Sequence, residues 1–285
     1  MAECKLELRI ATYMCPTHPV ELYELILQLL EESLDCYATL QYESRSPGPI
    51  PERPDPFETD KVDIAFMTAA AYMKLRARQT NKFVQLLPVT PVFAHQMNVE
   101  NRPGYFSDVI IHADKRAHNV NTLLDLRGCT FAYSDENSLS GSKIVLKTLK
   151  EKGENAAFFG SYLRSGSHLA SAQMVLSKQA EWAAVDSTTL LYSKKFMQDG
   201  GKEIITLETL GRLPPYPVVC NSRLSDNVKN GIVKTLLSLP QTREWKNKFA
   251  KFGIIKFDTN NESTYDGPAA QMWSIQKEKL NVRYY

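Results

Sequence analysis

The sequence predicts a two-lobed α/β protein, in which mainly parallel sheets carry helices on both faces. Short apolar strands alternate with amphipathic helices along most of the chain, which is the pattern of such sheets. The length of 285 residues suffices for two lobes with cores of their own. A composition with 43% hydrophobic and 23% charged residues is that of an ordinary globular protein.

The first third of the chain contains the elements of a first sheet. Apolar spacing on one face predicts a helix over residues 20–34, and an alanine-rich stretch predicts another over 68–78. Residues 44–56 contain five prolines without periodicity, which indicates an exposed loop. The strands are expected at residues 6–10, 62–66, 83–87 and 92–96.

The remaining two thirds repeat the alternation of strand and helix. Strands are expected at residues 107–112, 130–133, 156–162, 182–185, 204–208 and 217–220. Helices are expected at residues 141–152, 169–177, 188–196, 226–239 and 242–252. In sheets of this kind, ligands bind beyond the carboxyl ends of the strands.

Charge, hydropathy and cysteine usage exclude several classes of protein. A net charge of +2 with scattered lysines argues against nucleic acid as a partner. No apolar run is long enough for membrane insertion, and the printed start of the chain lacks the basic and apolar pattern of a signal peptide. We therefore expect a cytoplasmic protein. The five cysteines are odd in number and widely spaced, so neither a disulfide framework, a metal site nor a cofactor is expected.

A serine-rich loop, residues 134–142, follows the strand at 130–133 and leads into a helix. Unpaired backbone N–H groups and the helix dipole favour an anion at such a helix N-terminus. Ser138 and Ser140 can add hydroxyl donors, and Gly141 lets the backbone approach a ligand closely. The same serines are also what an ordinary helix N-cap prefers, so this loop alone leaves both interpretations open.

Seven separated segments together resemble the phosphonate/phosphite/phosphate ABC-transporter substrate-binding family, here without an apparent signal peptide. Their order and spacing match that family from about residue 6 to residue 255. The segments are residues 61–66, 102–107, 125–128, 137–141, 165–168, 183–187 and 215–219.

The resemblance implies a type II periplasmic-binding-protein-like fold with a ligand cleft between two lobes. Lobe 1 would comprise residues 1–91 and 214–285, and lobe 2 would comprise residues 92–213. Tyr105, Ser138, Ser140 and His168 occupy positions that resemble the family's ligands to phosphonate oxygens.

The chain departs from the family pattern at several ligand positions. Met67 replaces a tyrosine, and Leu139 stands in the serine loop where the family often has threonine. Thr189 and Tyr216 stand where family members that bind aminophosphonates have carboxylates, which argues against a ligand with an ammonium group. Asp186 can accept a proton from the ligand, orient His168, or cap the next helix.

Three hypotheses follow for the function. The first is a non-catalytic cytosolic binding protein for a small phosphate- or phosphonate-like anion, with no cofactor and with an unidentified protein partner. The second is a cytosolic enzyme on the same fold that uses His168, paired with Asp186 or a nearby serine, as general acid or base on a phosphorylated or carboxylated metabolite. The third is an interaction module that has lost its pocket.

Overall fold

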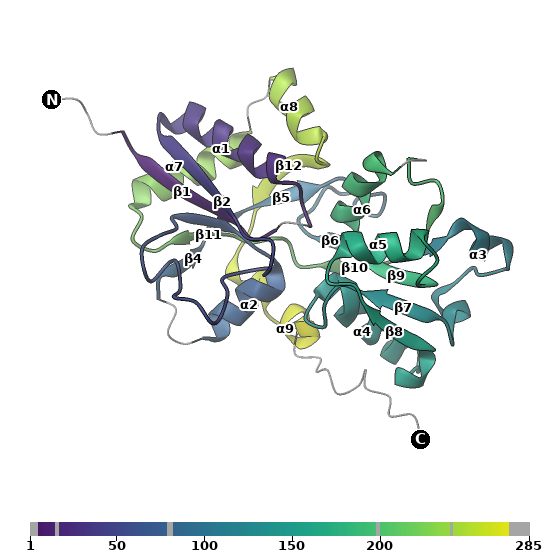
Figure 1. The fold of residues 1–285 in the computed structure, drawn as a ribbon. Helices are drawn as coiled ribbons and strands as arrows, with labels where there is room; N and C mark the ends of the chain where they lie inside the picture. The colour runs from purple at the N-terminus through teal and green to yellow at the C-terminus, as the bar shows by residue number, and fades with distance from the viewer. Residues whose placement is uncertain (1–4, 15–16, 79–81, 198–199, 240–241, 274–285) are drawn as a thin grey trace. The chain divides into compact units, whose positions relative to one another are not determined.

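The computed structural model describes residues 5–14, 17–78, 82–197, 200–239 and 242–273 (Figure 1). These residues form two compact units. Unit 1 contains the chain up to Gly104 together with Pro214–Tyr265, and unit 2 contains Tyr105–Leu213 together with the segment that begins at Asp266.

Unit 1 is built on a five-stranded sheet with the strand order β2-β1-β3-β11-β4. Helix α1 buries the apolar stripe that its sequence spacing predicted, including Leu22, Ile26, Leu29 and Leu30. Figure 1 shows α1 and α2 on opposite faces of this sheet. A second, two-stranded sheet pairs β12 with β5, and α7 and α8 contact β12.

The elements of unit 1 have the following bounds: β1 Glu7–Thr12, α1 Val20–Leu34, β2 Tyr37–Tyr42, β3 Ile64–Phe66, α2 Ala69–Ala77, β4 Val84–Leu86, β5 Val89–Phe93, β11 Val218–Asn221, α7 Asp226–Ser238, α8 Arg243–Ala250, β12 Ile254–Thr259 and the 3-10 helix η5 Glu262–Tyr265.

Unit 2 has its own five-stranded sheet, with the order β10-β6-β9-β7-β8. Figure 1 shows α5 and α6 on one face of this sheet and α4 on the other. Its elements are β6 Tyr105–His112, α3 Ala113–Ala117, η1 Leu123–Leu126, β7 Thr130–Tyr133, η2 Leu139–Lys143, α4 Ile144–Glu151, η3 Ala156–Phe158, β8 Ser161–Arg164, α5 His168–Leu176, β9 Trp182–Asp186, α6 Ser187–Ser193, η4 Lys194–Phe196, β10 Ile204–Leu213 and α9 Pro268–Trp273.

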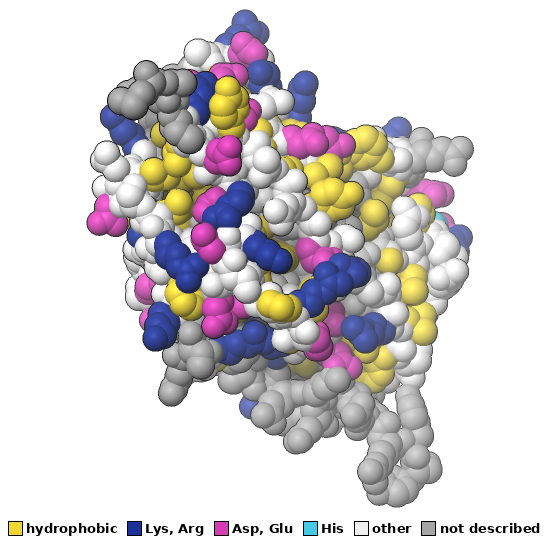
Figure 2. Space-filling view, turned by 60° about the vertical axis from the view of Figure 1, so that its left-hand side comes forward, with side chains coloured by type: hydrophobic (Ala, Val, Ile, Leu, Met, Phe, Trp, Pro, Cys, Tyr) yellow, Lys and Arg dark blue, Asp and Glu magenta, His cyan; other side chains and the backbone are white. Residues whose placement is uncertain are grey.

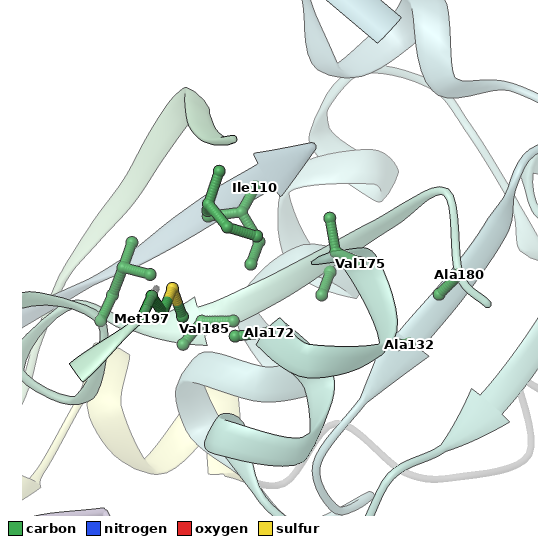
Figure 3. Close-up of a cluster of buried hydrophobic side chains, with 10 residues drawn as sticks. Ile110, Ala132, Ala172, Val175, Ala180, Val185 and Met197 are labelled. Carbon is green, nitrogen blue, oxygen red and sulfur yellow. The ribbon is translucent and has the colours of Figure 1, made fainter. Parts of the chain in front are cut away.

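One apolar cluster fixes the helices of unit 2 on the sheet (Figure 3). Ala172 and Val175 of α5 pack there with Ile110 of β6, and Ala183 and Val185 of β9 complete the contact. Small alanine side chains let the helix come close to the strands. This packing holds the first residue of α5 and the last residue of β9 in fixed positions beside each other.

Each five-stranded sheet is mainly parallel, as the sequence predicted, and contains one strand of opposite direction. Strands β2, β1 and β3 are parallel in unit 1, and β8, β7 and β9 are parallel in unit 2. One strand runs against the others in each sheet: β11 in unit 1 and β6 in unit 2. Strands β4 and β10 pair antiparallel with these two and therefore run in the same direction as the parallel strands. Strands β11 and β6 lie next to the points where the chain passes from one unit to the other, and they run against the direction of the βαβ strands.

The sequence analysis did not predict two of the strands, β2 and β12. Strand β2 is an edge strand whose side chains are mostly exposed, so it lacks the apolar alternation that marks a half-buried strand. Strand β12 was not expected either, and it exists because β5 supplies its partner. The strand expected at residues 156–162 is instead the short η3 followed by β8.

The two units divide the chain differently from the predicted lobes. Residues 92–104 stay with unit 1 because β5 pairs with β12 and Val92 forms a bridge to Gly104. The segment from Asp266 belongs to unit 2, where α9 contacts η2. Both differences arise from pairings between segments far apart in the chain, which local patterns do not reveal.

On the face shown in Figure 2, basic and acidic side chains are interspersed rather than separated into patches of one sign. This distribution agrees with the small net charge of +2. None of the helices within the described ranges combines the length and apolar composition needed to cross a bilayer.

Candidate functional site

Three parallel strands of unit 2 end at one edge of the sheet, and the loops that follow them carry the predicted site residues. Strand β7 leads to the serine turn, β8 leads to His168, and β9 ends at Asp186. The carboxyl edge of such a sheet is where ligands bind. The topology therefore brings together residues that are up to about fifty positions apart in the chain.

The serine turn begins with Ser138, which caps a single π-helical turn, η2, that continues into α4. The Gly141 N–H donates to Ser138 Oγ at 2.9 Å, and the Lys143 N–H donates to the Ser138 carbonyl at 3.1 Å. The helix thus starts two residues before the predicted position and in a wider form. π-Helical turns are rare and are found frequently at functional sites.

Two backbone donors at the start of this turn lack an acceptor. Among the described residues, no hydrogen bond is donated by the N–H of Leu139 or the N–H of Ser140, although both residues are buried. Buried N–H groups are nearly always paired in folded proteins. Two such groups at a helix N-terminus are suited to an anion.

His168, the first residue of α5, meets both serines of the turn. Its Nε2 lies 3.3 Å from Ser138 Oγ and 3.3 Å from Ser140 Oγ. The Asp186 N–H donates to Nδ1 at 3.2 Å. Because Nδ1 acts as an acceptor, the neutral ring carries its proton on Nε2, which becomes a donor toward the serines.

The pKa of His168 is lowered from its usual value of 6.5, chiefly because burial penalises the imidazolium. The Asp186 carboxylate and the Ala184 backbone oppose this effect. His168 is therefore a neutral donor near pH 7.

Tyr105 contributes a phenol at the start of β6. Its pKa is raised, first by burial and then by the Asp186 carboxylate, while a hydrogen bond with the Ser140 side chain opposes the shift. The hydroxyl consequently stays protonated and able to donate. Next to it, Ser107 Oγ donates to the Ser140 carbonyl at 2.7 Å and ties the serine turn to β6.

Asp186 acts as the N-cap of α6. Its Oδ1 accepts from the Thr188 N–H at 2.9 Å and from Thr188 Oγ1 at 2.7 Å. Its backbone N–H donates to His168 Nδ1, and its carboxylate favours the charged form of the ring electrostatically. Of the roles considered from the sequence, the helix cap is the one this geometry shows. Thr189 follows on the same helix and is buried.

Met67 and Tyr216 belong to unit 1, and both are buried there. Met67 follows β3 and is fully buried. The Tyr216 ring stands edge-on to His18, with centroids 4.9 Å apart, and to Phe93 at 5.8 Å. The residues that the structure brings together as polar donors are thus those of unit 2.

The sequence analysis did not single out two buried residues near the turn, Ser134 and Lys143. It did single out Gly141 as a residue of the turn. Ser134 Oγ is buried without a hydrogen-bond partner. Lys143 is buried in η2, and burial lowers its pKa. A Cβ on Gly141 would lie 2.2 Å from Ser134 Oγ, so this position has room only for glycine. Burial of a serine or a lysine inside a serine-rich loop has no signature in a single sequence.

The part of the chain that the structure describes holds no group of three or more His, Cys, Asp or Glu side chains able to bind a metal ion. Within it, Cys36, Cys129 and Cys220 are free thiols.

The chain matches the model of the family described as "ABC transporter, phosphonate, periplasmic substrate-binding protein" over residues 14–265. This match covers most of the chain. The protein belongs to this family. The resemblance inferred from seven short segments is thereby confirmed.

Individual relatives agree with this assignment. The Phosphonates-binding periplasmic protein of Escherichia coli (strain K12) is 26% identical over 205 residues, which are 71% of this chain and 58% of that relative's length. A binding protein component of an ABC phosphonate transporter from Pseudomonas aeruginosa has 19% identity and a TM-score of 0.70, with 92% of this chain and 83% of the other covered.

PhnD1 of Prochlorococcus marinus, solved in complex with methylphosphonate, is 13% identical with a TM-score of 0.69, and the match covers 93% of this chain and 96% of the other. At these identities the structural likeness shows the fold alone. It confirms a two-lobed periplasmic-binding-protein-like fold with mixed α/β sheets.

The predicted cytoplasmic location is wrong. The family is one of periplasmic substrate-binding proteins, and the Escherichia coli relative is itself periplasmic. The prediction depended only on a pattern that was not seen at the printed start of the chain, and such an absence says nothing about location.

Proposed function

We propose that this protein is a non-catalytic binding protein that holds a phosphonate- or phosphate-like oxyanion on the donors of unit 2. The observation that carries this proposal is the convergence of His168 Nε2 on two serine hydroxyls, 3.3 Å from each. It occurs at a helix N-terminus where the N–H groups of Leu139 and Ser140 donate no hydrogen bond to any residue that the structure describes. The hydroxyl group of Tyr105, which forms a hydrogen bond with the Ser140 side chain, is a further donor beside them.

These donors suit an anion although His168 and Tyr105 are uncharged. His168 is neutral near pH 7, Tyr105 remains a phenol, and the serine hydroxyls and backbone N–H groups carry only partial charges. Hydrogen bonds to an ionised acceptor are roughly twice as strong as those between neutral groups, so the ligand supplies the charge that strengthens them. The helix dipole adds a favourable field at the same place.

The tautomer of His168 argues against the enzyme hypothesis. A histidine that activates a serine must accept the hydroxyl proton on the nitrogen facing it, while its other nitrogen is a donor held by an acceptor. Here the Asp186 N–H donates to Nδ1, so Nε2, the nitrogen that faces Ser138 and Ser140, carries the proton. The ring is thus set to donate to a ligand rather than to take a proton from serine.

The identity of the ligand is part of this proposal. The Escherichia coli relative is named for phosphonates, and PhnD1 was solved with methylphosphonate, which supports a phosphonate for this chain as well. Thr189 and Tyr216 offer no carboxylate to an ammonium group. We therefore expect methylphosphonate, phosphite or phosphate to bind more tightly than 2-aminoethylphosphonate.

Calorimetric titration in a phosphate-free buffer tests the proposal with these four anions and with sulfate. Ser140→Ala and Tyr105→Phe each remove one donor, and each should weaken binding about 10–100-fold, as expected for a hydrogen bond to a charged group of about 1.5–3 kcal/mol. Ser177→Ala is the matched control, because this exposed serine bonds only within its own helix end.

Two results would contradict the proposal. Failure of every anion to bind or to raise the melting temperature would favour an interaction module without a ligand, since a ligand of the folded state must stabilise it. Turnover of a phosphate ester that is lost in His168→Ala would favour the enzyme.

A further inference from the structure

Ser134, near the serine turn, has a side-chain hydroxyl that forms no hydrogen bond with any described residue. It is the first residue after β7 and is 4% exposed. Its carbonyl accepts from the Gly166 N–H at 3.1 Å, so the backbone is paired. Its Oγ, in contrast, is buried and has no hydrogen-bond partner in the described part of the chain.

The hydroxyl lies inside the donor set. The position of a Cβ on Gly141 would be 2.2 Å from Ser134 Oγ, 3.0 Å from Ser138 Oγ and 3.1 Å from His168 Cε1. These three side chains therefore surround the same glycine. Ser138 and His168 are two of the donors assigned above to the anion, so Ser134 is their immediate neighbour.

The hydroxyls of two neighbouring serines with structural roles, Ser142 and Ser165, form hydrogen bonds within the protein. Ser142 Oγ donates to backbone carbonyls of the same loop, with distances of 3.1–3.2 Å. Ser165, which follows the next strand, bonds the Tyr133 and Ser167 carbonyls and Ser171 Oγ. Ser134 differs from both, because a buried hydroxyl without a partner destabilises the protein that contains it. If Ser134 had only a structural role, alanine at this position would make the folded protein more stable.

We propose that Ser134 is a further specificity-determining residue of the anion site, and that its hydroxyl finds its acceptor in an oxygen of the bound oxyanion. This inference rests on the proposed function, because it assumes that an anion occupies the donors of unit 2. It explains why the hydroxyl beside Gly141 is buried without a partner: the group is positioned for an acceptor that the described residues do not supply.

Ser134→Ala tests the inference through two effects of opposite sign. The ligand-free variant should melt about 2–4 °C higher than the wild type, because the unsatisfied hydroxyl is gone. Its affinity for methylphosphonate and for phosphate should fall about tenfold, because one donor to the anion is lost. Ser165→Ala is the matched control: it removes a hydroxyl that hydrogen-bonds the Tyr133 and Ser167 carbonyls and Ser171 Oγ, so its melting temperature should fall while its affinity stays within about twofold of the wild type.

The outcomes separate this inference from the function it rests on. If the wild type binds methylphosphonate and Ser140→Ala weakens binding, but Ser134→Ala binds as tightly as the wild type, the inference fails and the proposed function stands. A Ser134→Ala variant that melts as low as Ser165→Ala is also evidence against it, since Ser134 would then be a structural residue. If the wild type binds neither methylphosphonate nor phosphate, the proposed function itself fails.

Discussion

The predicted ligand residues of the two units have opposite chemical surroundings. In unit 2, Ser138 and Ser140 each lie within hydrogen-bonding distance of His168, and Tyr105 forms a hydrogen bond with Ser140. In unit 1, Met67 is enclosed in the core, and the ring of Tyr216 packs against other rings. In both units, the predicted ligand residues lie at the ends of strands or in the loops beside them.

The difference shows how the two kinds of residue are held in place. The donors of unit 2 are positioned by directional hydrogen bonds, so a small displacement of one changes what the others can bind. The residues of unit 1 are positioned by packing, which tolerates exchange between side chains of similar volume. Anion recognition should therefore be sensitive to small changes in unit 2 and insensitive to conservative changes in unit 1.

The largest effect is expected for Gly141→Ala. The added methyl group would lie 2.2 Å from Ser134 Oγ and 3.1 Å from the His168 ring, so the turn must move away from its donors. We expect a stability loss of roughly 1–3 kcal/mol, as for overpacking, and an affinity for methylphosphonate lowered more than about 100-fold. Urea denaturation and calorimetric titration measure the two quantities.

Gly231→Ala in α7 is the matched control, since its added methyl would meet only the end of the Leu34 side chain. This variant should bind like the wild type. Equal affinity in Gly141→Ala and Gly231→Ala would show that the geometry of the serine turn does not matter for binding.

An intermediate effect is expected for the pH dependence of stability. Burial lowers the pKa of His168 below 6.5, so the unfolded chain binds this proton more readily than the folded protein. The free energy of unfolding should then fall as the pH drops through 6.5, with a contribution of at most about 1.4 kcal/mol per pH unit from this residue. Urea denaturation of the wild type and of His168→Gln, compared between pH 7.5 and 5.5, measures it.

The wild type should lose more stability over this range than His168→Gln, and saturating methylphosphonate should reduce that loss, because an anion beside Nε2 favours the charged ring. Identical pH profiles of the two proteins would contradict both the buried neutral state and the role of His168 at the site.

The smallest effect is expected in unit 1. Met67→Leu keeps the apolar volume of the side chain, so stability should change by less than about 1.5 kcal/mol and anion affinity by less than about threefold. A tenfold loss of affinity for methylphosphonate, comparable with that expected of Ser140→Ala, would mean that unit 1 takes part in anion recognition. The contrast between the units would then have to be abandoned.

Much of the site could be predicted from the sequence because its residues lie in short local motifs. The loop that contains Ser138, Ser140 and Gly141 follows an apolar strand and precedes a helix, and this order already favours an anion-binding turn. His168 directly follows a serine N-cap, as its position before a helix indicated. The cytoplasmic location, by contrast, was inferred from an absence, and it was wrong.

The sequence by itself determined most of the order of strands and helices and the polar character of the turn, because periodicity and capping are local properties of the chain. Only the tertiary structure decided that Nδ1 of His168 faces the Asp186 N–H, that Ser134 is buried without a partner, and that β5 pairs with β12. Each of these features depends on contacts between segments that are far apart in the chain. Such contacts determine the burial and the hydrogen-bond partners of each side chain, and therefore which side chains can donate to an anion.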